Sequence, residues 1–298
     1  MELRKITPDE LAIIINNHKK WLNGEANGQR ADLDWTDLRG VNLDGVNLTK
    51  ASIKNTNLHC SSMIGTTLND ANMSWSCLDK INLSYASMIE AVLYSTSIDQ
   101  AILVEANMKR SDLGYAIVTS ANLCGANLSE AEAGSAKFDY SNLSNTSLEK
   151  AKLVSASFVC AKLKGANLRR AIMYRATLDC ARLQCADLQR TSLIGASLEE
   201  ADLTGASMDG INLCKTNLYR TKTDKNYIQI NIFNIKATYC LEDDWISVSH
   251  PGTFYNCSFC DLEHLIKKED TNTPLIRDEL SKLIKCINGI KSAVTPAD

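Results

Sequence analysis

The sequence lacks the features that mark several classes of protein. No apolar run approaches the roughly 18–20 residues that a membrane-spanning helix requires. A net charge of −3 is too small to indicate a surface for nucleic acid or membrane. The 11 cysteines are odd in number and show no disulfide framework, which fits a reducing compartment. The N-terminal stretch lacks the cleavage site of a signal peptide, so we expect a cytoplasmic protein, with non-classical secretion as an effector as the alternative. From the small charge and the short apolar runs we expect no direct binding to nucleic acid or membrane.

Motifs of catalysis are missing as well. The four histidines are scattered, and the chain has no Gly-rich phosphate loop, metalloprotease motif or nucleophile elbow. We therefore expect a protein that is not an enzyme and has no cofactor. Enzyme activity in the short region 223–298 is a minor alternative.

A repeat dominates what is present. Every fifth residue from 33 to 218 is Leu, Ile, Met, Val or Phe, with Ala133 as the one exception among 38 positions. The residue two places earlier is mostly Ala and otherwise Ser, Thr, Val or Ile. A period of five matches neither a helix nor a strand. It fits a square coil with four five-residue sides, in which turns of 20 residues stack at about 4.8 Å into a column roughly 46 Å long.

The exception predicts a local irregularity. In EAEAGSA, at residues 130–136, a small residue replaces the large inward one and Gly134 follows. We expect a small cavity or a bend of the column at this turn.

The repeat resembles a known family. The stretches ADLDWTDLRGVNLDGVNL and ANLCGANLSEA are similar to the A(D/N)LXX motif of pentapeptide-repeat proteins. This resemblance implies an all-β solenoid over residues 31–222, a right-handed quadrilateral β-helix of about 9–10 coils. Family members include adaptors and secreted effectors, and the quinolone-resistance and self-immunity members bind type II topoisomerases with a rod that imitates duplex DNA.

The two ends of such a column should be covered. Residues 1–30 are expected to form an N-terminal helical cap, because Thr7, Pro8 and Glu10 match a capping box with Pro in the first turn. Residues 223–298 are expected to form a small mixed C-terminal cap. There YIQINIFNIKATYC alternates like a strand, GTFYNCSFCD fits a last half-turn of the coil, and an amphipathic helix ends the chain. That helix is either a lid or a homodimer contact.

A weak metal-like constellation lies in the C-terminal region. Its members are Cys240, Cys257, Cys260 and His264. One CxxC with a distant third cysteine falls short of the two paired clusters of most zinc sites. Buried small thiols are the simpler interpretation.

Two outer columns are candidates for function, each with an ordinary solvated surface as its alternative. The first is a candidate acidic stripe at 20-residue spacing, formed by Asp79, Asp99, Asp139, Asp179 and Glu199. The second is a candidate aromatic face, and aromatics are enriched where proteins bind one another. It is formed by Trp35, Trp75, Tyr94, Tyr115 and Tyr174.

The charge balance favours one function over the other. Residues 31–222 carry 20 acidic and 19 basic groups, whereas duplex DNA of the same length carries roughly 27 negative charges. A cluster of Lys and Arg between 150 and 190 would also oppose mimicry. We therefore expect a rigid rod that presents a binding face to an unidentified protein partner. The alternative is a DNA mimic that binds DNA gyrase or another topoisomerase.

Overall fold

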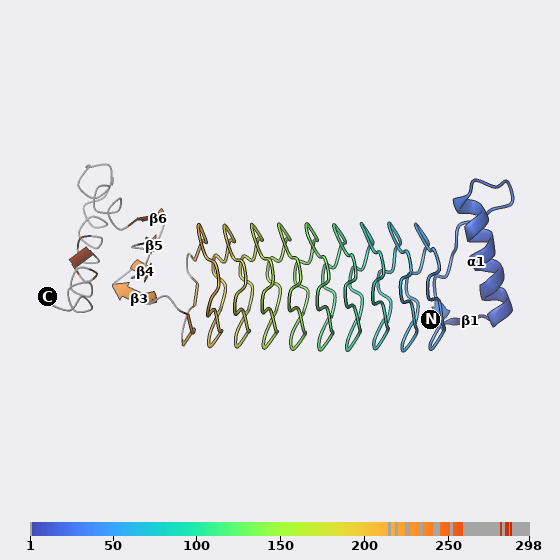
Figure 1. Cartoon of the computed structure of the whole chain (residues 1–298), viewed down its shortest axis with the longest axis horizontal. Coiled ribbons are helices and arrows are strands. Elements are labelled where there is room, and N and C mark those ends of the chain that lie inside the picture. Colours follow the sequence, from blue (N-terminus) through green and yellow to red (C-terminus); the bar gives the residue numbers. More distant parts are fainter. Residues whose placement is uncertain are drawn as a thin grey trace.

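The computed structural model describes residues 2–213, 216–217, 220–223, four strands between 227 and 258, and residues 281, 284, 285 and 287. A short strand and a helix come first, β1 (Arg4–Lys5) and α1 (Pro8–Leu22). A long column follows, which contains β2 (Thr36–Asp37). Figure 1 shows α1 across one end of this column and a small sheet beyond the other end.

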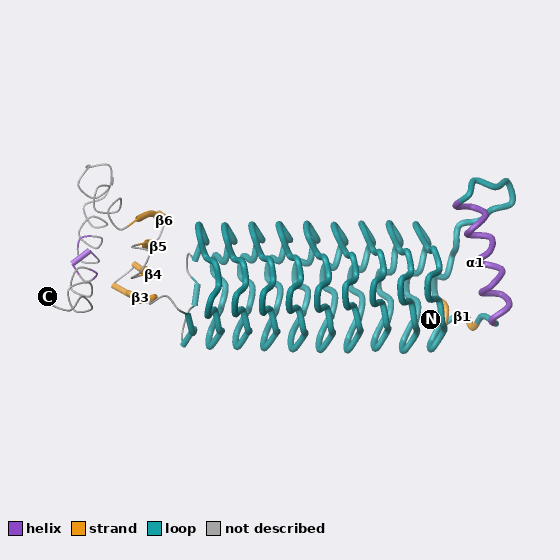
Figure 2. The backbone as a smooth tube through the Cα atoms, viewed as in Figure 1, coloured by secondary structure: helices purple, strands orange, loops and turns teal. Residues whose placement is uncertain are grey.

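The column is a β-solenoid with a 20-residue turn. Each side pairs in parallel with the equivalent side of the next turn, from Asp32 with Ser52 through to Asp202 with Lys222. Backbone hydrogen bonds such as Leu33 N to Ser52 O (2.8 Å) repeat along its length. The period of four five-residue sides is therefore confirmed, and Figure 2 shows the turns stacked in register.

The inside of the column is filled by the residues of the five-residue period. All of them from Leu33 to Leu213 are at most 6% exposed, and most of the small residues two places earlier are buried too. Each Leu-sized side chain contributes about 1.5–3 kcal/mol through burial. Because every side adds such a residue, stability accumulates along the stack.

Each corner of the square is made by the last residue of a side. These residues have positive φ, as at Trp35 (58°) and Trp75 (58°), and glycine occupies some of the corners. A turn hydrogen bond crosses most of the corners, for example Ala51 N to Leu48 O at 2.9 Å. Bulky corner residues consequently hold a left-handed conformation that costs about 1–2 kcal/mol relative to the usual one.

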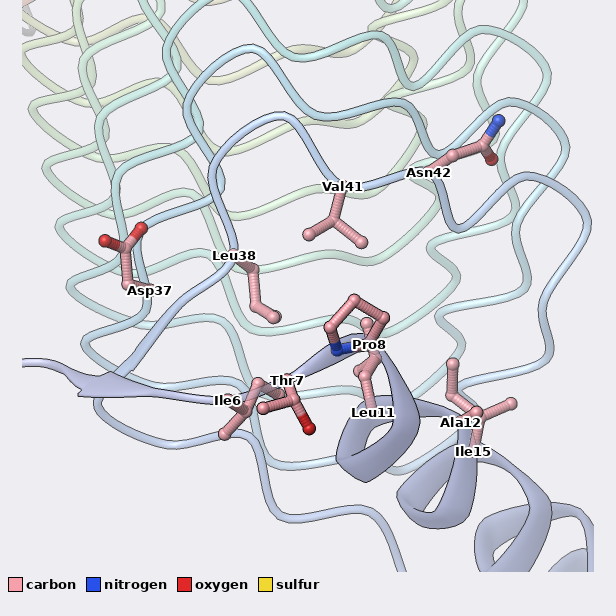
Figure 3. Close-up of a pocket in the computed structure, with 10 residues that line it drawn as sticks. All are labelled: Ile6, Thr7, Pro8, Leu11, Ala12, Ile15, Asp37, Leu38, Val41 and Asn42. Carbon is pink, nitrogen blue, oxygen red and sulfur yellow. The ribbon is translucent and has the colours of Figure 1, made fainter.

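Helix α1 packs on the first turns of the column. Its predicted capping box is confirmed, since Glu10 N donates to Thr7 Oγ1 (3.2 Å) and Thr7 N donates to Glu10 Oε2 (2.7 Å). Leu11 is buried in the core, and β1 pairs in parallel with β2. A cavity of about 410 Å³ lies between α1 and the column, lined mainly by apolar side chains such as Ile15 and Val41 (Figure 3).

A buried histidine joins α1 to the column. His18 is fully buried and stacks on Trp21, with ring centroids 5.5 Å apart. Its Nδ1 accepts a hydrogen bond from Ala31 N (3.0 Å), so the proton of the neutral ring is on Nε2. Nε2 is buried and has no hydrogen-bond partner among the described residues. The pKa of His18 lies below its ordinary value because the ring is buried. The backbone of Thr49 raises the pKa and offsets part of this effect.

The expected bend at Ala133 is not found. The backbone ladder runs through this turn without a break, with Ala133 N to Lys152 O at 2.8 Å. Two large side chains follow the small one in the period. Phe138, in the same turn as Ala133, stacks on Phe158 at 5.0 Å, and both rings are fully buried.

The chain beyond the column forms a four-stranded antiparallel sheet. Its strands are β3 (Tyr227–Ile232), β4 (Ile235–Cys240), β5 (Trp245–His250) and β6 (Thr253–Ser258), paired in chain order. The expected last half-turn of coil at GTFYNCSFCD is therefore wrong, because β6 pairs antiparallel with β5. In a hairpin, a strand forms its hydrogen bonds with the strand just before it in the chain. The five-residue spacing of Phe254 and Phe259 does not distinguish this pairing from a side of the coil. Of the predicted terminal helix, the few described residues are helical, with Ile287 buried and Lys285 exposed.

Candidate binding faces of the column

Three aromatic side chains from successive turns are in direct contact on one side of the column. Trp75 packs edge-on against Tyr94, with ring centroids 6.1 Å apart and planes at 79°. Tyr94 packs in the same way against Tyr115, at 5.6 Å and 70°. We call Trp75, Tyr94 and Tyr115 the aromatic ladder.

The backbone beside the aromatic ladder makes room for it. A Cβ on Gly114 would lie 3.1 Å from the ring of Tyr94, so only glycine leaves the ring its full space. Trp75 and Tyr115 are more than half exposed, at 57% and 58%. The three sides that carry the ladder, at 71–75, 91–95 and 111–115, hold one charged residue, Asp112. Its carboxylate accepts a hydrogen bond from Gly114 N at 2.9 Å. The result is an exposed apolar surface with a defined shape.

The other two predicted members of the candidate aromatic face lie on the same side but apart from the ladder. Trp35 is two turns from Trp75, with Asn55 at the corner between them. Tyr174 lies three turns beyond Tyr115 in the other direction, where the Arg175 guanidinium lies 5.0 Å from the centre of its ring. The structure thus brings together three of the five predicted aromatics.

The candidate acidic stripe is tied into the backbone ladder. Asp79 Oδ1 accepts hydrogen bonds from Ser97 Oγ (2.6 Å) and Asp99 N (3.1 Å), both one turn further along the column. Asp139 and Asp179 likewise accept from the backbone of the following turn, at Val159 N and Glu199 N.

These contacts limit what the stripe can offer to a partner. All five carboxylates are only partly exposed. Asp99 accepts hydrogen bonds from the Thr119 hydroxyl and the Gln100 amide, and Glu199 accepts from Asn217. Hydrogen bonds that hold successive turns together explain carboxylates in this column without any partner.

The weak metal-like constellation of the C-terminal region lies only in part within the described residues. Cys240 ends β4 opposite Trp245, and Cys257 lies in β6 opposite Ile246. The two cysteines therefore flank β5 with a register offset of one residue. Cys260 and His264 lie outside the described residues.

A column of stacked five-residue sides with a closed apolar interior defines a β-solenoid, a class of rigid, extended scaffolds. Within this class, the family model for pentapeptide repeats matches eight overlapping segments that together span residues 29–219. The chain belongs to the pentapeptide-repeat family.

Solved structures of the family resemble the chain. HetL from the cyanobacterium Nostoc sp. strain PCC 7120, a protein involved in heterocyst differentiation regulation, is 32% identical over 68% of this chain and 93% of its own, with a TM-score of 0.41. QnrB1, a plasmid-mediated fluoroquinolone resistance protein, is 16% identical over 65% of this chain and 92% of its own, with a TM-score of 0.43. Rfr23 from the cyanobacterium Cyanothece 51142 is 33% identical over 39% of this chain and 61% of its own, with a TM-score of 0.22. A search of curated proteins finds no match.

The sequence pattern did not reveal that Tyr94 bridges Trp75 and Tyr115. One signal could have revealed it: Trp75 and Tyr115 are corner residues, whereas Tyr94 lies one position before the corner of the turn between them. Gly114, which leaves space for the Tyr94 ring, is a second signal.

Among the described residues, no helix has the length and apolar character needed to cross a membrane.

Proposed function

We propose that the protein is a non-enzymatic interaction module that binds a protein partner on the aromatic ladder. The observation that carries the proposal is the contact of Trp75, Tyr94 and Tyr115 in one exposed row. Trp and Tyr are the residue types most enriched at binding hot spots. The three sides at 71–75, 91–95 and 111–115 also carry only one charged residue, Asp112, so little charge keeps this surface solvated.

Rigidity supports the same proposal. Each ladder residue lies on a side held by backbone hydrogen bonds to the next turn, such as Trp75 N to Tyr94 O at 3.0 Å. The rings also hold one another in place. A partner would therefore meet a surface that is already ordered, and binding would lose little conformational entropy.

The corner positions are a further argument. Trp75 and Tyr115 both have φ of 58°, in the left-handed region. Glycine or asparagine would occupy such a corner with less strain. Bulky aromatics at strained corners are easier to explain if their exposed rings have a use.

The test compares two pairs of exposed aromatics. Purified protein, immobilised as bait in lysate of the native host, is compared with Trp75→Ser/Tyr115→Ser and with the matched control Tyr85→Ser/Tyr140→Ser. Tyr85 and Tyr140 are equally exposed corner residues on other sides of the column. We expect the captured protein to be lost from the first variant and retained by the second, as measured by quantitative mass spectrometry. Equal capture by both variants would contradict the proposal.

The acidic stripe supports a second candidate function, binding of DNA gyrase as a DNA mimic. The observation in its favour is the alignment of five carboxylates in one column. The test measures binding of purified gyrase by wild type and by an Asp79, Asp99, Asp139, Asp179→Asn variant. Asn69 makes the same two contacts to its next turn as Asp79, so the variant should keep the fold. Gyrase binding that depends on these carboxylates and not on Trp75 would favour mimicry over the aromatic ladder.

A further inference from the structure

Three side chains with metal-binding atoms converge at one corner region of the column. They are His59, Cys77 and Asp79, and their imidazole nitrogen, thiol sulfur and carboxylate oxygen all lie within 4.8 Å of one another. His59 and Asp79 occupy equivalent positions in successive turns. Cys77 lies two residues before Asp79 on the same side, at the position that pairs with Asn57 below and Ser97 above.

The hydrogen bonds around Asp79 leave one oxygen directed toward this cluster. Oδ1 is engaged by Ser97 and by the backbone of Asp99 in the next turn. Oδ2 accepts from Cys77 Sγ at 3.4 Å. The carboxylate is thus fixed by one oxygen and presents the other beside the thiol.

We propose that His59, Cys77 and Asp79 bind a zinc ion. Zinc takes nitrogen, thiolate and carboxylate ligands at about 2.0–2.3 Å, which places ligand atoms roughly 3–4 Å from one another in a tetrahedron. The three atoms lie within 4.8 Å of one another, so they must approach further to reach that spacing. Three protein ligands leave the fourth position of the tetrahedron open to water.

The mixed ligand set favours zinc over other common ions. Mg²⁺ and Ca²⁺ prefer sets made only of oxygen, whereas imidazole and thiolate select softer ions. Arg39, one turn before His59 in the same column, does not oppose a cation here. Its guanidinium is bound to Asp37, with Nε 2.8 Å from Oδ1 and a terminal nitrogen 2.6 Å from Oδ2.

Binding exchanges a proton for the metal. Burial raises the pKa of the Cys77 thiol; the backbone of Asp79 offsets part of this rise, and the Asp79 carboxylate adds to it. The metal-free thiol is therefore protonated at neutral pH and donates to Asp79. Zinc replaces this proton, which leaves to solvent as the Zn–S bond forms, so affinity increases with pH.

Cobalt(II) is the probe, because a Co–thiolate bond gives a charge-transfer band in the near ultraviolet. We expect one equivalent of Co²⁺ to produce this band in the purified wild-type protein and Zn²⁺ to abolish it by competition. Cys77→Ser should remove the band, and His59→Gln and Asp79→Asn should each weaken binding at least about tenfold. Cys60→Ser and Cys124→Ser are matched controls that keep both band and affinity. Circular dichroism verifies that each variant is folded.

Several results would overturn the site. These are the absence of a band in the wild type, a band that survives in Cys77→Ser, or a band that Cys60→Ser removes. A second readout does not depend on any one variant. Zn²⁺ should raise the melting temperature of the wild type more than that of His59→Gln, because the variant binds the ion more weakly. Equal shifts in both proteins would also reject the site.

Discussion

The Asp44 carboxylate and the Ser62 hydroxyl, one turn apart along the column, lie 2.6 Å apart in a hydrogen bond. The same Asp44 oxygen accepts from Ile64 N at 2.8 Å. Asn69 makes the equivalent pair of contacts with Ser87 and Ile89. One side-chain oxygen after the inward Leu therefore fastens one turn to the next, whether or not it carries a charge.

This contact predicts a dependence of stability on pH. The Ser62 hydroxyl, and then the Ile64 amide, lower the pKa of Asp44 below its ordinary value. The stabilisation of the folded protein by the ionised Asp44 carboxylate is therefore fully present above the ordinary Asp pKa of about 3.9. It is lost as the pH falls through the lowered pKa of Asp44. Asp44→Asn should unfold with a weaker dependence on pH in this acid range than wild type, as measured by urea denaturation at several pH values. The reciprocal variant Asn69→Asp should gain such dependence, and an unchanged profile in both variants would contradict the assignment.

His18 predicts a second pH effect, in the docking of α1. Its lowered pKa means that the folded protein keeps the ring neutral while the unfolded chain takes up a proton below about pH 6.5. Stability is thus complete above that pH and falls as pH decreases toward the lowered value. His18→Gln keeps an acceptor for Ala31 N without the titrating ring. We expect its melting temperature to change less than that of wild type between neutral pH and pH about 5, and parallel curves would contradict the prediction.

The strain at the corners can be measured at an exposed position without side-chain contacts to lose. Ser155 has φ of 56° and is exposed. Ser155→Gly should raise the free energy of unfolding by about 0.5–1 kcal/mol, because relief of the left-handed strain exceeds the entropy cost of glycine. Ser192→Gly, on the flat part of a side, should lower it. Chemical denaturation checks both, and a loss of stability in Ser155→Gly would show that the corners are unstrained.

The packing around Ala133 predicts a non-additive pair. Because Phe138 is larger than Val118, its counterpart in the preceding turn, we infer that it occupies the space that Ala133 leaves. Ala133→Leu alone should destabilise the protein by about 1–3 kcal/mol through overpacking. Ala133→Leu/Phe138→Leu should recover much of this loss in a double-mutant cycle. If Ala133→Leu alone raises stability, the site contains the cavity that the sequence pattern predicts.

The sequence predicts the structure best for the features that follow directly from the five-residue period. The inward positions, the 20-residue turn and the start of α1 at Thr7 and Pro8 were predictable, because each depends on spacing within a few residues or on a strict repeat. The sheet formed by β3 to β6 was predictable only as alternation. Its antiparallel pairing depends on hairpins, and Thr253–Ser258 consequently resembled one more side of the coil.

The candidate sites divide in the same way. The sequence alone determined which outward residues share a column, since that follows from the period, and so it placed Asp79 above His59 and Trp75 on the side of Tyr115. Only the tertiary structure decided which of these neighbours touch. Rotamers and the space left by Gly114 join Tyr94 to the aromatic ladder, and bonds to the next turn occupy the acidic stripe. The tertiary structure likewise decides that Cys77 converges with His59 and Asp79. Contacts between turns depend on side-chain direction and not on spacing along the chain.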